Sequence, residues 1–247
     1  MFYRVLFKFI VGCIGGSVIL NPLLAFAQPA IPTQLRDTAG DLYAKEIEQA
    51  TSQGIIAGFE DGTFRPQAAL TREQLVSIVV NAMPKVPLAP YQGTAPTLPS
   101  ILTQVTANPF PDVDQARWSA PKIQYLKSLG ILRGYPDGTF RPTQTVTRAE
   151  LIVMLQAIDR YLVEFRGNWD GRQNFGFPDP LAFSDIQNHW ARDTIRAMSS
   201  NCHEGRVATF LNETGTRFAP NEPARRNYAA AATVREIRCL SIPSIPS

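Results

Sequence analysis

The chain has 247 residues, of which 45% are hydrophobic, and its formal net charge at pH 7 is +3. That charge is the difference between 24 basic and 21 acidic residues, so no field of one sign would attract nucleic acid or a membrane surface over the whole molecule. The length suits one globular domain or a few small repeats.

The first 27 residues have the three parts of a secretory signal peptide. Arg4 and Lys8 form a basic start, residues 9–24 are largely apolar, and residues 25–27 read Ala-Phe-Ala, a cleavage motif. Cleavage there removes two positive charges and lowers the net charge to +1. We therefore predict export across the inner membrane to the periplasm, the cell wall or the cell surface.

Two other interpretations of the N-terminus compete with cleavage. An uncleaved membrane anchor is disfavoured by the cleavage motif and by Asn21-Pro22 near the end of the apolar run. A lipoprotein site at Cys13 is disfavoured because only four apolar residues precede that cysteine. No later apolar run is long enough to span a bilayer, so the mature chain should contain no integral membrane segment.

Cys202 and Cys239 remain after processing. In an exported protein, a pair of cysteines indicates a disulfide. The alternative is a metal site that also uses His203, but three candidate ligands, two of them adjacent, fall short of the usual four. We predict a disulfide and no metal site.

One stretch of sequence occurs twice. Residues 54–72 and 130–148 align without a gap, and both contain Asp-Gly-Thr-Phe-Arg-Pro. Such repetition indicates units that cannot bury their apolar faces alone. The predicted division of the chain is a signal peptide (1–27), a tether (28–36), repeat 1 (37–83), a Pro-rich linker (84–109), repeat 2 (110–160), a connector (161–181), a degenerate repeat 3 (182–240) and a tail (241–247). The linker should be extended and exposed, whereas the connector aromatics Trp169, Phe175 and Phe177 should pack on the body.

Each repeat is predicted to contain two helices joined by a loop. Apolar spacing and end signals place the first helices at residues 41–53, 117–129 and 189–200, and Gly54 and Gly130 should end the first two. The second helix of repeats 1 and 2 opens on a capping box, formed by Thr71 with Gln74 and by Thr147 with Glu150. Its apolar residues recur at helical spacing, so three such helices facing one axis would form a central three-helix bundle. The loop aromatics Phe59, Phe64, Tyr135 and Phe140 should face the core.

An arginine follows each capping threonine. Arg72 and Arg148 lie in the first helical turn, where the helix dipole disfavours a cation. We interpret each as part of an anion site beside free backbone N–H groups, with a solvated arginine as the alternative. In repeat 3, either Arg225 or Arg226 could take this position, and neither restores the capping box. Repeat 3 is therefore predicted to be mainly structural.

These motifs resemble the S-layer homology family, a cell-wall-anchoring repeat. Repeat 2 carries a near-complete pattern in Phe110, Asp112-Val113, Trp118 and residues 130–135, 137–142 and 147–150. Repeat 1 keeps the middle and the end of the pattern but has Leu42 in place of the tryptophan. Repeat 3 keeps Phe183, Asp185-Ile186 and His189-Trp190-Ala191. The resemblance covers most of residues 37–240.

The resemblance implies a mainly α fold, in which three helix-loop-helix repeats form a pseudo-threefold trimer around a central three-helix bundle. It also implies a non-catalytic module without a cofactor. Such a module binds cell-wall polysaccharide, often pyruvylated, or peptidoglycan-linked glycan in grooves between the repeats.

The candidate glycan-binding residues are Arg72, Arg148, Trp118, Trp190, Asp112, Asp185, Gly58 and Gly134. The two tryptophans could stack on a sugar, although burial of the indole face is the expected state. The two aspartates should serve turns first and accept sugar hydroxyls second. The two glycines allow close backbone approach, either for packing or for a ligand.

Two other functions stay open on the sequence. An envelope protein-interaction or assembly subunit could use the same scaffold to hold a protein partner. A wall-glycan hydrolase is disfavoured because no pair of carboxylates clusters in the sequence and no G-x-S-x-G or H-E-x-x-H motif occurs.

Overall fold

Helices make up nearly all of the regular secondary structure in the part of the chain that the structure describes. The computed structural model describes residues 35–87, 97–165, 178–200 and 206–241, all within one unit, Gln34–Ser247. Its α-helices are α1 (Ala44–Ser52), α2 (Arg72–Ala82), α3 (Ala120–Ser128), α4 (Arg148–Phe165), α5 (Arg192–Met198) and α6 (Arg226–Leu240). Two 3₁₀ turns, η1 (Met83–Lys85) and η3 (Leu211–Glu213), join them, and only isolated β-bridges occur in these ranges. The predicted mainly α class is confirmed.

The first helix of each predicted repeat starts three residues later than the sequence suggested. The backbone N–H groups of Ala44, Ala120 and Arg192 each bond the carbonyl three residues earlier, so a tight turn precedes the helix. At the other end, Gly54 and Gly130 have φ angles of 69° and 71°, which confirms both as left-handed terminating glycines.

Helix α4 continues to Phe165, five residues into the predicted connector. Leu162 is fully buried, and the rings of Tyr161 and Phe165 stack with centroids 5.6 Å apart. Packing of this last turn therefore extends the helix beyond the repeat. The connector aromatics Trp169, Phe175 and Phe177 lie outside the described residues, as does the predicted signal peptide.

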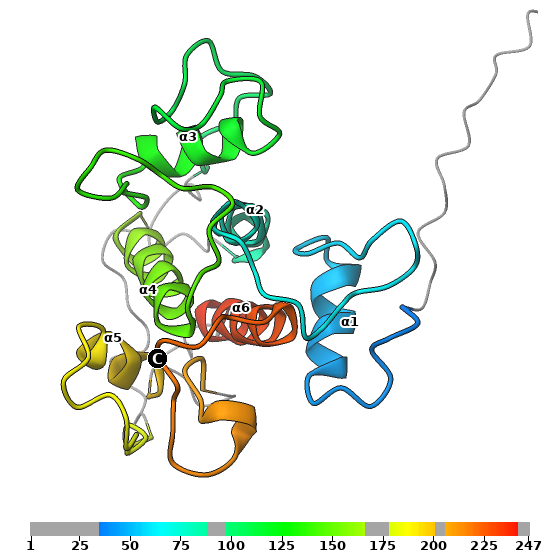
Figure 1. Ribbon diagram of the computed structural model, residues 1–247, viewed down its shortest axis with the longest axis vertical. Helices are drawn as coiled ribbons and strands as arrows, with labels where there is room; N and C mark the ends of the chain where they lie inside the picture. Colours follow the sequence, from blue (N-terminus) through cyan, green and yellow to red (C-terminus); the bar gives the residue numbers. More distant parts are fainter. Residues whose placement is uncertain (1–34, 88–96, 166–177, 201–205, 242–247) are drawn as a thin grey trace, which may run out of the picture. The chain divides into compact units, whose positions relative to one another are not determined.

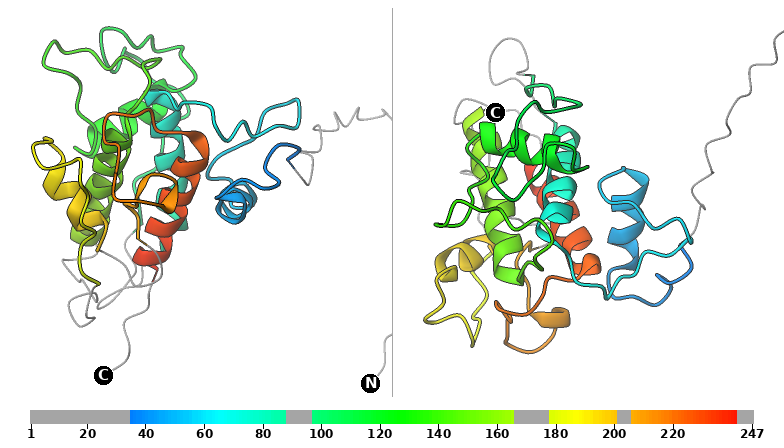
Figure 2. Two further views of the ribbon diagram at one scale, coloured as in Figure 1. Left: turned by 60° about the horizontal axis from the view of Figure 1, so that its bottom comes forward. Right: turned by 45° about the horizontal axis from the view of Figure 1, so that its top comes forward.

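Three inner helices are surrounded by three outer ones (Figures 1 and 2). The inner helices α2, α4 and α6 contact one another, and each also carries one outer helix: α3 packs on α2, α5 on α4, and α1 on α6. Each outer helix thus packs on an inner helix from another predicted repeat. We call these three contacts seams and name them by their helices. The chain runs from each outer helix to its own inner helix through residues 53–71, 129–147 and 199–225, and the two helices of one repeat are not among the packing pairs named above.

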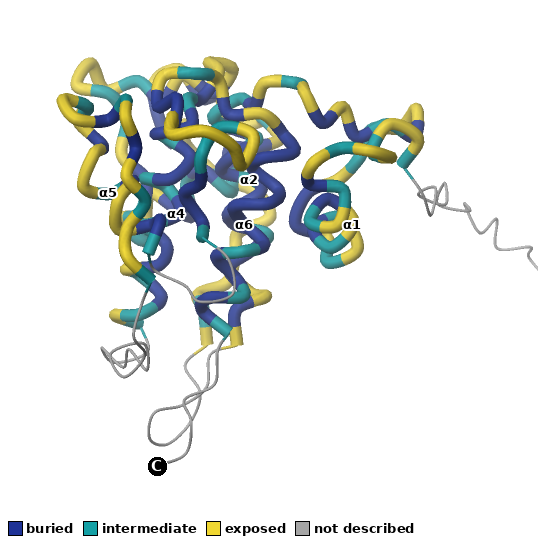
Figure 3. The backbone as a smooth tube through the Cα atoms, turned by 90° about the horizontal axis from the view of Figure 1, so that it is seen from below, coloured by how far each residue is buried: buried dark blue, intermediate teal, exposed yellow. Residues whose placement is uncertain are grey.

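Apolar burial is concentrated on the inner helices (Figure 3). Nearly every residue of α6 is buried, including the fully buried Ala229, Ala230, Ala231 and Ala232. Because an alanine side chain ends at Cβ, this helix allows its neighbours to approach closely.

A closed ring of backbone hydrogen bonds links the segments that lead into the inner helices. Leu70 donates its N–H to the carbonyl of Ala224, Ala224 donates to Val146, and Val146 donates to Leu70, each at 2.9 Å. All three residues are buried. Each segment therefore depends on the other two to satisfy its buried backbone groups.

Only part of the predicted aromatic core is correct. Phe64 and Phe140 are buried, but Phe59 and Tyr135 are half-buried. The guanidinium groups of Arg65 and Arg141 cover those two rings, 3.9 and 4.0 Å from the ring centroids. Cation–π contact with an exposed arginine thus replaces burial in the core.

The described parts of the linker are residues 84–87 and 97–109. Residues 97–109 have no helix and are mostly exposed, as predicted, but Pro84 and Lys85 belong to η1 and Val86 is buried, so the linker is not extended from its start. Within the described ranges, no helix combines the length and apolar character that a membrane crossing needs. Cys239 is buried and disulfide-bonded, while Cys202, its predicted partner, lies outside the described residues.

Replacing Gly134 with alanine should destabilise the fold more than the same change at Gly58. A Cβ at Gly134 would lie 2.7 Å from the Thr139 carbonyl oxygen and 2.8 Å from the Phe110 ring, whereas the nearest atom at Gly58 is the flexible tip of Leu35. We expect Gly134→Ala to cost about 1–3 kcal/mol in the free energy of unfolding, measured by urea denaturation. An equal or larger cost for Gly58→Ala would contradict this packing.

Candidate functional site

Each inner helix begins at an arginine that reaches into the loop of another segment. Arg72, Arg148 and Arg226 are the first residues of α2, α4 and α6. Their Nε–H groups donate, in that order, to the carbonyls of Phe140 (2.8 Å), Phe218 (2.8 Å) and Phe64 (2.9 Å). The equivalent residue in the third segment is therefore Arg226, while Arg225 is the exposed residue before the helix.

The backbone N–H groups at these helix starts are not free. Those of Arg72 and Glu73 bond the carbonyls of Gln144 and Pro142. The same pair of bonds runs from residues 148–149 to Glu222 and Pro220, and from residues 226–227 to Ala68 and Pro66. The prediction of an anion site on free amides is wrong, because a neighbouring loop already uses these donors.

Arg148 is only 4% exposed. Its guanidinium lies 3.7 Å from the ring centroid of Tyr228 and also donates to the Thr209 carbonyl at 3.1 Å. Arg72 is more open but lies 3.6 Å from a Glu150 carboxylate oxygen. Both arginines thus hold the segments together, and the buried one has no open face for a ligand.

The predicted capping boxes form at the first two inner helices. Thr71 and Gln74 exchange hydrogen bonds of 3.0 and 3.4 Å, and Thr147 and Glu150 exchange bonds of 2.7 and 3.2 Å. At α6 the residue in this position, Arg225, makes no side-chain cap.

Asp112 and Asp185 pin the loops rather than point toward solvent. Asp112 accepts the N–H groups of Phe140 (2.8 Å) and Arg141 (2.6 Å), and Asp185 accepts those of residues 218 and 219, both at 2.8 Å. The structure adds Asp37, which does the same for residues 64 and 65 and which the sequence analysis missed. Its spacing to the repeated Phe-Arg-Pro motif is nearly that of Asp112, so the repeat alignment could have revealed it.

Gly58 and Gly134 serve packing. A Cβ on either residue would come within 3.0 Å of a loop carbonyl, and side chains of the same segment fill the space. Close packing therefore accounts for the glycine at both positions.

Trp118 and Trp190 are exposed, which corrects the expected burial. Their exposed fractions are 57% and 68%, and Leu42, at the matching place in the first segment, is 55% exposed. All three residues lie in the tight turn just before an outer helix, outside its buried face. A single exposed apolar residue is ordinary on a protein surface, so it is the repetition at matching positions of the three segments that makes these side chains candidates for a contact surface.

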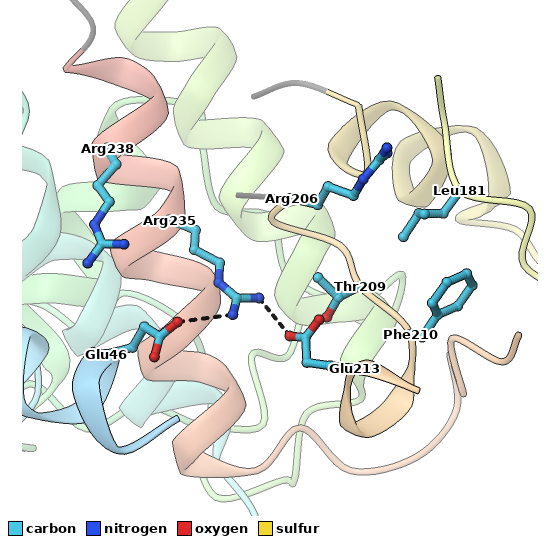
Figure 4. Close-up of a pocket in the computed structure, with 8 residues that line it drawn as sticks. All are labelled: Glu46, Leu181, Arg206, Thr209, Phe210, Glu213, Arg235 and Arg238. Carbon is cyan, nitrogen blue, oxygen red and sulfur yellow. Dashed lines mark hydrogen bonds and ion pairs between the residues drawn. The ribbon is translucent and has the colours of Figure 1, made fainter. Parts of the chain in front are cut away.

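A pocket of about 390 Å³ lies where α1, α6 and the segment 206–213 meet (Figure 4). It is lined by Glu46, Leu181, Arg206, Thr209, Phe210, Glu213, Arg235 and Arg238. Arg235 bridges two carboxylates, with Glu46 at 3.0 Å and Glu213 at 2.7 Å. The Oγ1 of Thr209, a residue only 4% exposed, has no hydrogen-bond partner in the described structure.

Two guanidinium groups in this pocket have neutral partners in the part of the chain that the structure describes. Arg206 donates to the carbonyls of Asp179 and Ser199, and Arg238 donates to the side-chain oxygen of Gln49. The pocket wall therefore carries positive charge that no described carboxylate balances. No repeated motif marks these residues, and only the spacing of Arg235 and Arg238 on one helix face could have suggested them.

Replacing Arg148 with alanine should act on stability. The change leaves the buried carbonyls of Phe218 and Thr209 without donors, and we expect a loss of about 2–4 kcal/mol in the free energy of unfolding by urea denaturation. Trp190→Ala, at an exposed site, should change it by less than about 0.5 kcal/mol. If both variants unfold at the urea midpoint of the parent, the anchoring role of Arg148 is wrong.

Comparison with known proteins identifies the first two segments. A family model for the S-layer homology domain matches residues 35–76 and 109–152. Cell surface glycoprotein 1 of Acetivibrio thermocellus is 35% identical over 167 residues, which is 67% of this chain and 6% of the relative. The cellulosome-anchoring protein of the same organism is 31% identical over 150 residues, 60% of this chain and 28% of the relative. An endoglucanase of Bacillus sp. strain KSM-635 is 35% identical over 129 residues, 52% of this chain and 12% of the relative.

The chain thus spans less than a third of the length of each of these relatives. The matched residues coincide with the first two predicted repeats, while the third repeat stays a prediction. Residues 35–76 and 109–152 are therefore the parts of this chain that are similar to the S-layer homology domain.

Proposed function

We propose that this protein is a non-catalytic anchoring module of the cell envelope that binds cell-wall glycan. The observation that carries the proposal is the exposure of Trp118 and Trp190 at matching positions of two segments. An exposed indole offers a flat apolar face with a polar edge, which suits the apolar face and the hydroxyl groups of a sugar ring. The domain match and the relatives whose names describe cellulosome anchoring and surface layers support the same role.

We further infer that residues 182–240 are a third repeat and that the three close with pseudo-threefold symmetry. The third segment makes the same kinds of bond as the other two. Arg226 takes the place of Arg72 and Arg148, and Asp185 takes the place of Asp37 and Asp112. The ring through Leu70, Val146 and Ala224 gives each segment one donor and one acceptor, as a threefold arrangement requires.

The pocket at the α6–α1 seam supports an anionic glycan as ligand. Its volume lies in the usual range for small-molecule sites, about 300–1,000 Å³. Arg206 and Arg238 bring charge that a carboxylate could balance, and Phe210 brings an apolar face. A sugar with a ketal-linked pyruvate has both matching features. This pocket replaces Arg72 and Arg148 as the place where we expect the anion.

Export and partners follow from the same proposal. The predicted signal peptide would deliver the protein to the periplasm, the wall or the cell surface, where wall polysaccharide or peptidoglycan is the expected partner. An envelope protein as partner is the alternative. Hydrolysis has little support, because the endoglucanase and exoglucanase relatives share only 12% of their lengths with this chain.

Removing both exposed indoles should abolish most of the binding to purified walls. In co-sedimentation, we expect Trp118→Ala with Trp190→Ala to weaken binding roughly tenfold or more, because each aromatic contact is worth about 0.5–1.5 kcal/mol. Leu102→Ala removes an exposed apolar side chain from the linker and should bind like the parent. Unchanged sedimentation of the double variant would overturn the proposal. Crosslinking to one envelope protein without wall binding would favour the adaptor, and release of reducing sugar would favour the hydrolase.

Arg238→Gln tests the charge of the pocket. The variant should bind pyruvylated walls about fivefold or more weakly, because it removes a charge-assisted contact. It should match the parent on walls from which mild acid has removed the pyruvyl groups. Arg192→Gln, at an exposed arginine on α5, is the matched control and should bind both preparations like the parent. Equal loss of binding to both wall preparations would show that Arg238 recognises no pyruvyl carboxylate.

A further inference from the structure

Glu73, at the start of α2, holds the turn that carries Trp118. It is 7% exposed, and its carboxylate accepts two hydrogen bonds from Arg117, from Nε at 2.7 Å and from Nη2 at 2.8 Å. The same carboxylate accepts the hydroxyl of Ser119 at 2.7 Å. A bidentate guanidinium–carboxylate pair with a third donor fixes both position and orientation.

The residues that Glu73 holds are the two chain neighbours of Trp118. Burial alone would raise the pKa of Glu73, but Arg117, Ser119 and the Trp118 indole N–H lower it, so the pKa is lowered overall. Trp118 thus stands between two anchored neighbours, while 57% of the residue stays exposed.

The α2–α3 seam is also pinned farther along. Lys122 on α3 donates to Ser77 (2.7 Å) and Asn81 (3.0 Å), which follow Glu73 at intervals of four residues on α2. The first turn of α3 and the turn before it therefore have polar contacts to α2 from Glu73 to Asn81. A fixed outer helix gives the turn before it a fixed position.

The other two seams lack this combination. At the α4–α5 seam, the residue that matches Glu73 is Ala149, so no carboxylate holds the turn of Trp190, although Thr194 and Gln156 bond farther along at 3.0 Å. At the α6–α1 seam, Asn227 matches Glu73 and bonds both oxygens of Asp41 at 3.1 and 3.0 Å, but Leu42 stands in place of the tryptophan. Among the described seams, only α2–α3 has both a polar clamp and an indole.

We propose that Glu73 is a positioning residue for Trp118, and that this clamp makes the α2–α3 seam the stronger of the two tryptophan-bearing glycan sites. The inference rests on the proposed glycan binding. Its physical basis is preorganisation: a side chain whose neighbours are already fixed loses less freedom when a sugar stacks on it. The turn of Trp190 has a weaker support, because the ring beside it, His189 at 5.4 Å between centroids, bonds the amide of Asn221 in an exposed loop and, within the described residues, no inner helix holds it.

The effect of Glu73 on the position of Trp118 can be measured without any glycan. In a chain whose Trp169 and Trp190 are changed to Phe, Trp118 is the only remaining indole. Glu73→Ala should lower its fluorescence anisotropy and increase its quenching by acrylamide, while Asn227→Ala should leave both unchanged. Glu73→Gln keeps the size of the side chain and one oxygen acceptor but loses the charge. Its anisotropy and quenching should lie between those of the parent and those of Glu73→Ala. An unchanged Trp118 signal in Glu73→Ala would overturn the positioning role.

The binding arm uses the full chain and purified walls. Trp118→Ala should weaken binding more than Trp190→Ala, and Glu73→Ala should weaken it about threefold to tenfold, the cost of immobilising one side chain. Asn227→Ala breaks the matching bridge at a seam without an indole, so it controls for general loosening of the fold. It should bind within twofold of the parent on walls without pyruvyl groups, where the pocket at the α6–α1 seam makes no contribution.

The outcomes separate the two proposals. A parent protein that does not sediment with walls overturns the proposed function, and the anisotropy still tests the clamp. If the parent binds but Glu73→Ala and Asn227→Ala lose binding equally, the effect of Glu73 is structural and the inference is wrong. Equal losses for Trp118→Ala and Trp190→Ala would likewise overturn the ranking of the two sites.

Discussion

The structure depends on one exchange of hydrogen bonds, in which the start of each inner helix donates to the loop of another segment. Two backbone N–H groups and a guanidinium take part at α2, α4 and α6. A helix start normally needs a cap or water for its first donors. Here the neighbouring loop supplies the acceptors, so no segment can complete its buried hydrogen bonds alone.

This exchange also decides where a ligand can bind. Donors that elsewhere form an anion site at a helix start are occupied by protein carbonyls, and Arg148 is enclosed by the rings it stacks on. The surfaces left for recognition are the turns before the outer helices, with Trp118 and Trp190, and the pocket beside Arg235. The proposed binding surfaces and the closure of the segments therefore use different residues, and variants can separate the two.

The sequence predicted the helices and their ends better than it predicted which helices pack on one another. Capping residues and terminating glycines act locally, so Thr71, Thr147, Gly54 and Gly130 behave as their types dictate. The packing of α1 on α6 depends on residues about 190 positions apart, such as Glu46 and Arg235, and no local pattern reports it. Arg72 and Arg148 were rightly singled out as misplaced against the helix dipole, but their acceptors are backbone carbonyls, which carry no sequence signal. Trp118 was expected inside because indoles are usually buried, and only its place in a turn outside the helix leaves it in solvent.

Native-state hydrogen exchange at the amides of Leu70, Val146 and Ala224 tests most directly whether the three segments close on one another. If each segment completes the next, these three protons exchange only through global unfolding, and all three report the same opening free energy as the denaturant transition. One of them could instead exchange through a local opening of much lower free energy while the other two stay protected. That result would contradict the account, because the three segments would then not depend on one another for their buried hydrogen bonds.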